Sequence, residues 1–197
     1  MRYNNFFCIT AFIILLPVAL FAATAPLPAT GQKTCHDSAG KEIACSGTGQ
    51  DGELKAGISI PAQRFVDNRN GTVTDKLTGL VWLKDANCLG TKTWQEALDA
   101  VKTVANGKCG LNDRSIAGKW RLPNINELES LVDLTQNKPA ISISNPFTDL
   151  QMSYYWSSTT KADEPVNAWY FYTLQGAVGY AGKNAVKGSV WPVRGGI

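Results

Sequence analysis

The placement of cysteines is the feature that most restricts how this chain can fold. Four of the five cysteines follow an apolar N-terminal stretch, and these four are Cys35, Cys45, Cys88 and Cys109. An even count in that position is typical of disulfides formed in an oxidising compartment. Four cysteines allow three pairings, and the local one, Cys35–Cys45 with Cys88–Cys109, is favoured because short loops close most readily. A zinc site is the alternative, although no Cys-x-x-Cys spacing occurs and the chain has a single histidine.

The N-terminal stretch itself, residues 1–25, predicts a cleaved signal peptide. A basic residue comes early, residues 6–21 are almost wholly apolar, and residues 22–25 are small. The apolar run is short for a membrane span, which needs about 20 apolar residues, and Pro17 interrupts it. An uncleaved anchor is the alternative, and the cleavage position stays open. We therefore expect a periplasmic or extracellular protein without a membrane span after cleavage.

Composition limits what the exported part can bind. Hydrophobic residues make up 44% of the chain, which indicates a globular protein. The formal net charge is +3, and no cluster of lysine and arginine occurs, so nucleic acid and membrane surfaces are poor candidate partners. We divide the chain into the signal peptide, a cysteine-containing leader at 26–60 and one domain at 61–197.

Local patterns predict the elements of these parts. In the leader, the turn-like residues 37–40 between two cysteines predict a small closed hairpin. In the domain, Asn70-Gly71 between β-branched residues predicts a hairpin over 64–75, and residues 80–83 predict another strand.

Two helices and a run of strands follow in the domain. Thr93 with Glu96 forms a capping box for a helix to about residue 105. Asn124 with Glu127 forms a capping box for a second helix, and the apolar face of that helix extends to Leu134. Strands are expected in the last third, at 154–158, 168–174, 177–180 and 190–194. Because helices and strands are segregated along the chain, the predicted class is α+β with antiparallel sheets.

Five ordered motifs resemble a known family. They are Asn-Gly-Thr-Val-Thr-Asp at 70–75, Thr-Gly-Leu-Val-Trp at 78–82, Trp-Arg-Leu-Pro at 120–123 followed by Glu127-Leu128, Tyr-Trp-Ser-Ser at 155–158 and Pro-Val-Arg-Gly at 192–195. Over residues 62–197 the sequence resembles the Lcl C-terminal domain family, a bacterial domain of largely unknown function named from the end of a collagen-like surface adhesin.

The resemblance implies a C-type-lectin-like fold, with two helices flanking antiparallel sheets. It also marks residues that we expect to be structural, namely Trp82, Trp120, Arg121, Glu127, Trp156 and Arg194. We expect the two arginines to form ion pairs, with Glu127 or Asp75 as partners.

Some relatives of this fold bind carbohydrate, and the adhesin domain is associated with sulfated glycosaminoglycans. The resemblance therefore implies an exported domain that recognises carbohydrate or another cell-surface polymer. A non-catalytic protein-interaction or structural domain of the cell envelope is the alternative, and an enzyme is the third hypothesis. Partners would be glycans or envelope proteins, and the oligomeric state is open.

The sequence offers little for catalysis. The single histidine, His36, lies in the leader, and no cysteine follows Cys109 in the part of the fold where formylglycine-generating relatives need reactive thiols. Glu127 and Glu129 are two positions apart on a predicted helix, so they point to different faces. We therefore expect neither an enzyme nor a cofactor.

A turn before one strand resembles part of a calcium-dependent lectin site. Glu164-Pro165-Val166-Asn167 resembles the Glu-Pro-Asn triplet of such lectins, but Val166 interrupts it and the companion Trp-Asn-Asp is missing. A polar turn is the favoured interpretation, and calcium is the alternative.

Aromatic residues and lysines complete the candidate site. Strand alternation places Trp169 and Phe171 on one face and Tyr170 and Tyr172 on the other. Core packing is the favoured role for these residues, and stacking of one face on sugar rings is the alternative. Lysines in nearby loops could contact sulfate, with a mixed-charge surface as the favoured interpretation. The candidate ligand-binding residues are Lys161, Glu164, Asn167, Tyr170, Tyr172, Lys183 and Lys187.

Overall fold

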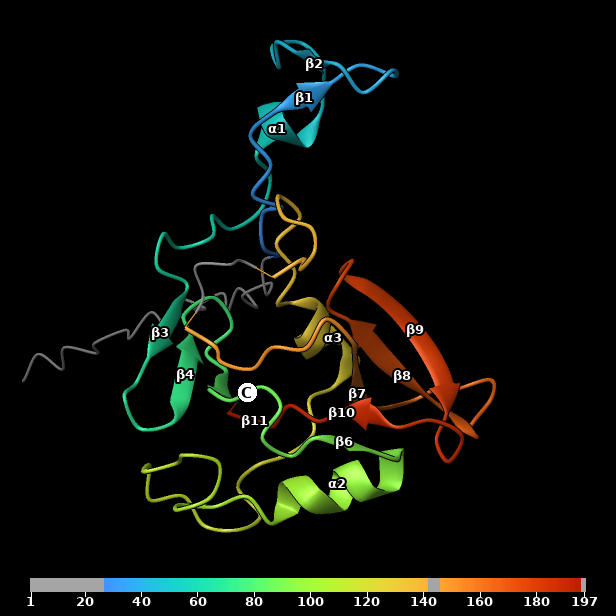
Figure 1. Cartoon of the computed structure of the whole chain (residues 1–197). Helices are drawn as coiled ribbons and strands as arrows, with labels where there is room; N and C mark the ends of the chain where they lie inside the picture. Colours follow the sequence, from blue (N-terminus) through green and yellow to red (C-terminus); the bar gives the residue numbers. More distant parts are fainter. Residues whose placement is uncertain (1–26, 142–145, 196–197) are drawn as a thin grey trace, which may run out of the picture.

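A computed structural model describes residues 27–141 and 146–195 of the protein (Figure 1). The predicted signal peptide lies outside the described residues. The helices are α1 (Asp51–Leu54), α2 (Trp94–Lys102) and α3 (Ile125–Glu129). The strands are β1 (Cys35–His36), β2 (Glu42–Ile43), β3 (Phe65–Asp67), β4 (Thr72–Asp75), β5 (Val81–Leu83), β6 (Thr91–Lys92), β7 (Tyr154–Thr160), β8 (Asn167–Tyr172), β9 (Ala177–Gly182), β10 (Gly188–Ser189) and β11 (Val193–Arg194).

Two sheets form the body of the molecule, which confirms the α+β class. One sheet has the strand order β11-β5-β4-β3, and the other has the order β6-β10-β7-β8-β9. The strand pairs are antiparallel except for β10 with β7, which run parallel. The segment predicted as one terminal strand, 190–194, is instead divided. It supplies β11 to the first sheet and follows β10 of the second, because Trp191 turns into the core between them.

The Asn-Gly hairpin is confirmed, and its glycine has a second role. β3 and β4 pair on either side of the turn, where Gly71 has a φ of +83° that favours glycine. A Cβ on Gly71 would lie 2.4 Å from the carbonyl oxygen of Gly110. The turn therefore packs directly against the loop that follows Cys109.

Both predicted capping boxes are present, but both helices end earlier than expected. The amide of Glu127 donates to Asn124 Oδ1 at 2.9 Å, and the amide of Asn124 donates to the Glu127 carboxylate at 2.8 Å. The prediction that Leu134 belongs to the apolar face was wrong, since its side chain is 57% exposed. The chain turns away there because the Asp133 carboxylate accepts from the amide and hydroxyl of Thr135.

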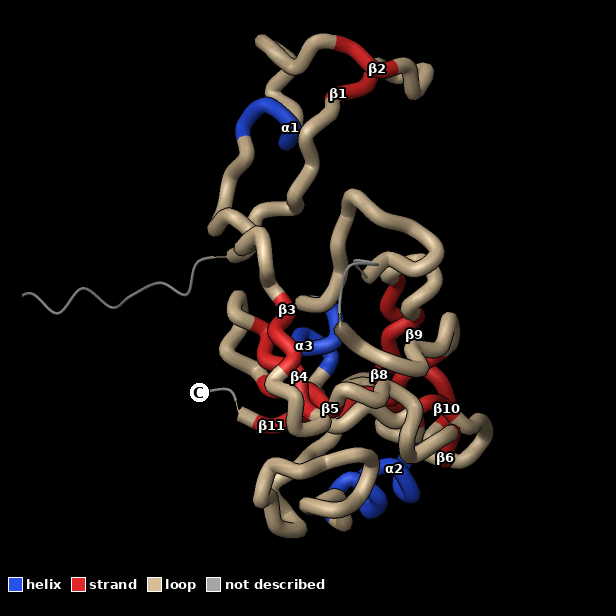
Figure 2. The backbone as a smooth tube through the Cα atoms, turned by 60° about the vertical axis from the view of Figure 1, so that its left-hand side comes forward, coloured by secondary structure: helices blue, strands red, loops and turns tan. Residues whose placement is uncertain are grey.

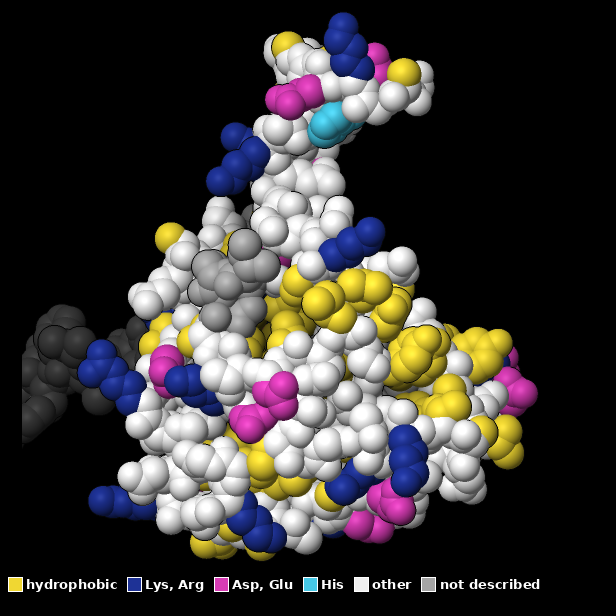
Figure 3. Space-filling model, viewed as in Figure 1, with side chains coloured by type: hydrophobic (Ala, Val, Ile, Leu, Met, Phe, Trp, Pro, Cys, Tyr) yellow, Lys and Arg dark blue, Asp and Glu magenta, His cyan; other side chains and the backbone are white. Residues whose placement is uncertain are grey.

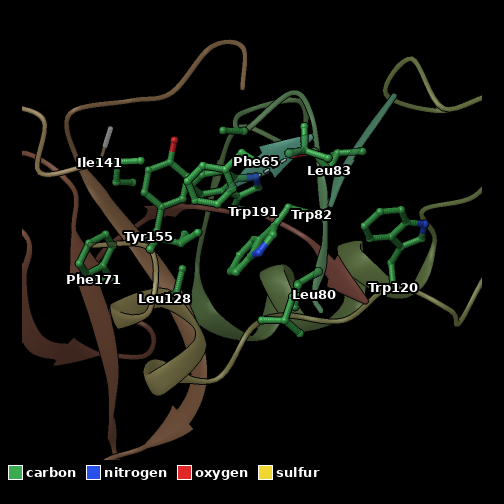
Figure 4. Packing of buried hydrophobic residues seen from close by; sticks show 14 of the residues in the cluster. Phe65, Leu80, Trp82, Leu83, Trp120, Leu128, Ile141, Tyr155, Phe171 and Trp191 are labelled. Atoms are coloured by element: carbon green, nitrogen blue, oxygen red, sulfur yellow. Dashed lines mark hydrogen bonds between the residues drawn. The ribbon is translucent and has the colours of Figure 1, made fainter. Parts of the chain in front are cut away.

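The main core lies between the two sheets and is centred on Trp191 (Figure 4). Its ring centroid lies 5.2 Å from that of Trp82, 4.8 Å from that of Phe147 and 5.4 Å from that of Tyr155. The indole N–H of Trp191 donates to the carbonyl of Leu83 at 2.9 Å. Because its N–H has a partner, this fully buried indole holds the sheets together without leaving an unsatisfied polar group.

A second, smaller core lies between α2 and the five-stranded sheet. Its buried members are Ala97, Val101, Leu122, Trp156, Ala168 and Val190. The indole N–H of Trp156 donates to the carbonyl of Lys92 at 3.0 Å. Since Tyr155 faces the main core, successive residues of β7 serve the two cores on opposite faces of the sheet.

Three arginine–carboxylate ion pairs link strands and helices to neighbouring segments. Arg121 and Glu127 form the expected pair, with two hydrogen bonds of 2.6 and 2.7 Å. Arg194 pairs with Asp113 at 2.9 Å, so the expectation of Glu127 or Asp75 as its partner was wrong. Asp75 is fully buried and instead accepts from Nε and Nη2 of Arg64.

The part of the leader that contains β1, β2 and α1, residues 35–54, lies apart from the two sheets (Figures 1 and 2). The Cys35–Cys45 disulfide closes the predicted hairpin of β1 and β2, and the unpredicted helix α1 packs beside it. The Glu53 carboxylate accepts from the amides of Gly47 and Gly49 at 2.6 and 2.8 Å, and these bonds lower the pKa of Glu53. The second predicted disulfide, Cys88–Cys109, is also present. No helix in residues 27–141 and 146–195 is long and apolar enough to span a membrane.

The two disulfides are expected to differ in their effect on stability. Replacing Cys88 and Cys109 with alanine should lower the free energy of unfolding by about 2–4 kcal/mol, because the bond restrains a loop inside the folded domain. Replacing Cys35 and Cys45 should leave the unfolding of the domain almost unchanged. Urea titration followed by tryptophan fluorescence measures the domain alone, since no tryptophan lies in the leader. Equal losses in both variants would contradict this division.

Asp75→Asn should cost about 3–5 kcal/mol of unfolding free energy, because it leaves the buried guanidinium of Arg64 without its carboxylate. The matched control is Asp99→Asn, which breaks an exposed pair with Lys102 and should cost less than about 1 kcal/mol. Thermal denaturation of both variants gives the comparison. A small and equal loss in the two would show that the buried pair is not important for stability.

Candidate functional site

Three tyrosines gather on one face of the five-stranded sheet, and we refer to Tyr154, Tyr170 and Tyr172 as the tyrosine face. Tyr154 on β7 is directly opposite Tyr172 on β8. The ring centroid of Tyr154 lies 4.7 Å from that of Tyr170 and 4.9 Å from that of Tyr172. Tyr154 is 46% exposed, and the other two are partly exposed. The rings therefore form one contiguous aromatic surface at the open end of the sheet.

The neighbouring strand β9 is flat on this side because its residues there are small. Ala177 pairs with Tyr172, Gly179 pairs with Tyr170, and Ala181 pairs with Ala168. A Cβ on Gly179 would lie 2.6 Å from the hydroxyl oxygen of Tyr170, so the tyrosine side chain lies directly over the glycine. The result is an aromatic surface beside a shallow floor of backbone and methyl groups.

The tyrosine hydroxyls of this face are available to a ligand. Among the described residues, none exchanges a hydrogen bond with the hydroxyls of Tyr154, Tyr170 or Tyr172. None of the three is a buried unsatisfied oxygen. Partial burial raises the pKa of Tyr170, and the neighbouring Tyr154 raises it further. The phenol of Tyr170 therefore stays protonated at neutral pH, where it can both donate and accept.

The two helices leave this end of the sheet uncovered. α3 packs on the opposite face, where Leu128 meets Tyr155 and Phe171 of the main core. α2 covers the tyrosine side around Trp156 and Ala168, and Tyr170 packs against the edge of this second core. Apolar side chains gather over β8 and β9 in the space-filling view, with acidic and basic residues interspersed around them (Figure 3).

The structure brings together only part of the candidate ligand-binding set. Tyr170 and Tyr172 share the tyrosine face, whereas Asn167, an odd-numbered residue of β8, lies on the opposite face with Phe171. Glu164 lies in the turn before β8, where its carbonyl accepts from the amide of Asn167 at 2.9 Å. Its carboxylate lies 3.6 Å from the Lys161 ammonium. The segment that resembles a lectin triplet therefore forms a turn with an internal ion pair.

The three candidate lysines lie in different environments. Lys161 donates to Asp163 at 2.6 Å, which raises the pKa of Lys161, and it lies over the ring of Tyr180. Lys183 donates to Thr160 and lies over the ring of Trp94. Lys187 is exposed, and its charge contributes to the lowered pKa of Glu96, which is due mainly to the amide of Thr93.

Sequence reasoning missed one residue of the tyrosine face, Tyr154, and the glycine beside it, Gly179. Tyr154 belongs to a predicted strand, but its place beside Tyr172 depends on the register between β7 and β8. Gly179 lies in a predicted strand as well, and a glycine inside a strand is a known signal of close approach by another group. That signal could have indicated the contact with Tyr170.

A family model describes most of this chain. The model of the Lcl C-terminal domain matches residues 71–194. The chain belongs to the Lcl C-terminal domain family. No curated protein sequence matches the chain. The match contains every residue of the tyrosine face and both cysteines of the Cys88–Cys109 bond, whereas the leader hairpin lies outside it.

Within residues 27–141 and 146–195, no three or more histidine, cysteine, aspartate or glutamate side chains group as metal ligands.

Gly179→Ala should displace the Tyr170 ring, because the added methyl would overlap its hydroxyl end. We expect a loss of unfolding free energy and a changed ring environment for Tyr170. In a Tyr170→Ala background the same Gly179→Ala change should cost little, since the ring is absent. A double-mutant cycle by urea denaturation measures this coupling. Strict additivity of the two changes would contradict the contact.

Proposed function

We propose that this protein is an exported carbohydrate-binding protein, and that its Lcl C-terminal domain binds sugar through the tyrosine face. The observation that carries the proposal is the set of three adjacent, partly exposed tyrosines over a strand of small residues. We further propose that the fold is C-type-lectin-like, as the sequence resemblance implies.

The chemistry of the tyrosine face suits a saccharide. Sugar rings present flat C–H faces that stack on aromatic rings, and their hydroxyls need polar partners at the rim. Tyr154 and Tyr172 lie with their rings 30° apart, which gives a nearly continuous surface. The free phenol groups supply donors and acceptors around it. Contiguous exposed apolar patches often mark binding sites on protein surfaces.

A lysine on the same side of the sheet could bind an anionic group of a longer glycan. Lys183 continues the row of Gly179 and Ala181, because alternate residues of a strand share a face. Lys183 lies four positions after Gly179 and one position beyond the end of β9, a span of roughly 13 Å at about 3.3 Å per residue. A chain of a few sugars could therefore reach from the tyrosines to this ammonium group. A sulfate or carboxylate on the glycan would be the partner of Lys183.

Two features of the chain, its N-terminal sequence and its disulfides, support export. The N-terminal sequence has the order of a signal peptide, and two disulfides suit an oxidising compartment. We propose that the protein works in the periplasm or outside the cell, where polysaccharides are exposed. Stacking of a sugar on tyrosine rings needs no metal ion, so we expect binding to be the same with calcium and with a chelator.

Tyr154→Ala and Tyr172→Ala should each weaken binding to the glycan selected on an array by at least tenfold, because each removes part of the stacking surface. Isothermal titration with and without calcium gives the affinity per protomer. Tyr180→Ala is the matched control, since Tyr180 is similarly exposed, at 50%, but lies on the opposite face of the same sheet. It should bind like the unaltered protein.

Two further results would decide the proposal. Lys183→Glu should weaken binding to a sulfated polymer more than to its desulfated form. Failure to bind any glycan on the array, together with co-purification of an envelope protein, would contradict carbohydrate recognition and favour a protein-interaction role. Equal losses in the Tyr154, Tyr172 and Tyr180 variants would reject the tyrosine face as the binding surface.

A further inference from the structure

The outer edge of β9 has the features of a strand that pairs with another chain. β9 is the last strand of its sheet and runs for six residues, Ala-Val-Gly-Tyr-Ala-Gly. It pairs with β8 over all six residues without a register shift. It contains no charged residue and no proline, and no bulge twists it away. Proteins usually protect exposed edges with one of these devices, because unpaired backbone groups attract other strands.

The other edges of the four-stranded and five-stranded sheets are protected. β6 has two residues and includes Lys92. β11 also has two residues and ends at Arg194, and β3 has three and ends at Asp67. Each is short and carries a charge, which is how edges are commonly made unattractive. β9, which lies at the margin of its sheet in Figure 1, is therefore the exception among the edges of these two sheets.

The phase of the β8–β9 ladder shows which backbone groups face outward. Beyond the strand end, the amide of Lys183 donates to the carbonyl of Val166 at 3.0 Å. In an antiparallel pair such bonds occur at every second residue, so Ala181, Gly179 and Ala177 bond to β8. The N–H and C=O groups of Val178 and Tyr180 therefore point away from the sheet. They are two donors and two acceptors on an open edge.

We propose that β9 pairs antiparallel with β9 of a second copy of this chain, across a two-fold axis at Gly179. In that register Val178 lies opposite Tyr180 of the partner subunit, and Tyr180 lies opposite Val178 of the partner subunit. Each pair exchanges two backbone hydrogen bonds, so the outward groups of both residues are satisfied. Pairs of an aromatic with a β-branched residue are among the favourable cross-strand pairs.

Charge and shape favour a second copy as the occupant. A two-fold axis places residues of one strand beside the same strand of the partner, so any charge in β9 would be set near a like charge. Residues 177–182 carry none. On the side of the tyrosine face, the strands would meet through Gly179, Ala177 and Ala181, which allow close approach. The two tyrosine faces would then lie on the same side of one continuous sheet.

Sedimentation equilibrium of the full chain, expressed with its N-terminal segment and purified after processing, tests this pairing. We expect a concentration-dependent monomer–dimer equilibrium. Tyr180→Pro should abolish the dimer, since it removes an outward N–H without breaking a bond to β8. Tyr180→Lys should do the same by placing a charge at the junction, and it serves if the proline variant does not fold. Ile116→Lys is the charge-matched control on another exposed surface, and it should keep the dimer.

Amide hydrogen exchange locates the contact within the strand. Protection of the Val178 and Tyr180 amides should rise with protein concentration, while that of Ala177 and Gly179 should not change. A protein that is monomeric at every concentration overturns the proposal, even if an unrelated peptide binds the edge. A dimer that persists in both folded Tyr180 variants also overturns it, because the subunits would then meet elsewhere.

Discussion

The structure depends on the burial of one indole, that of Trp191. It lies on the segment between β10 and β11, which belong to different sheets, so its position fixes the two sheets relative to each other. Contacts with Trp82 of the first sheet and Tyr155 of the second surround it, and the Leu83 carbonyl accepts its N–H. Truncating such a side chain would cost about 3–5 kcal/mol, which is a large fraction of the stability of a domain.

Because this core engages one face of the five-stranded sheet, the other face can have a different role. α3 completes the main core, and α2 closes a second core around Trp156. Beyond these helices, the same sheet leaves a row of tyrosines partly exposed beside the small residues of β9. The β-structure beneath holds the rings in place, so little conformational freedom would be lost when a ligand stacks on them.

Local features of the fold could be predicted from the sequence, and long-range ones could not. The caps at Thr93 and Asn124 depend on residues three positions apart, and both were predicted correctly. The end of α3 at Glu129 was missed because the amides of Leu131 and Val132 bond to carbonyls three residues back, a change that apolar spacing does not reveal. Tyr170 and Tyr172 were chosen by strand alternation, but Tyr154 joins them only through the register of β7 with β8. Asn167 was proposed from the resemblance to a lectin triplet and the lysines from their place in loops, and neither signal shows which face of the sheet a side chain occupies.

Nuclear magnetic resonance titration of the purified protein with its selected glycan tests the central claim most directly. The account predicts that the aromatic ring signals of Tyr154, Tyr170 and Tyr172 shift together, along with the amides of Ala177 to Ala181. Signals of the leader hairpin and of Trp191 should stay in place. Shifts confined to the leader, to the Lys161 turn or to the opposite face of the sheet would contradict carbohydrate recognition by the tyrosine face.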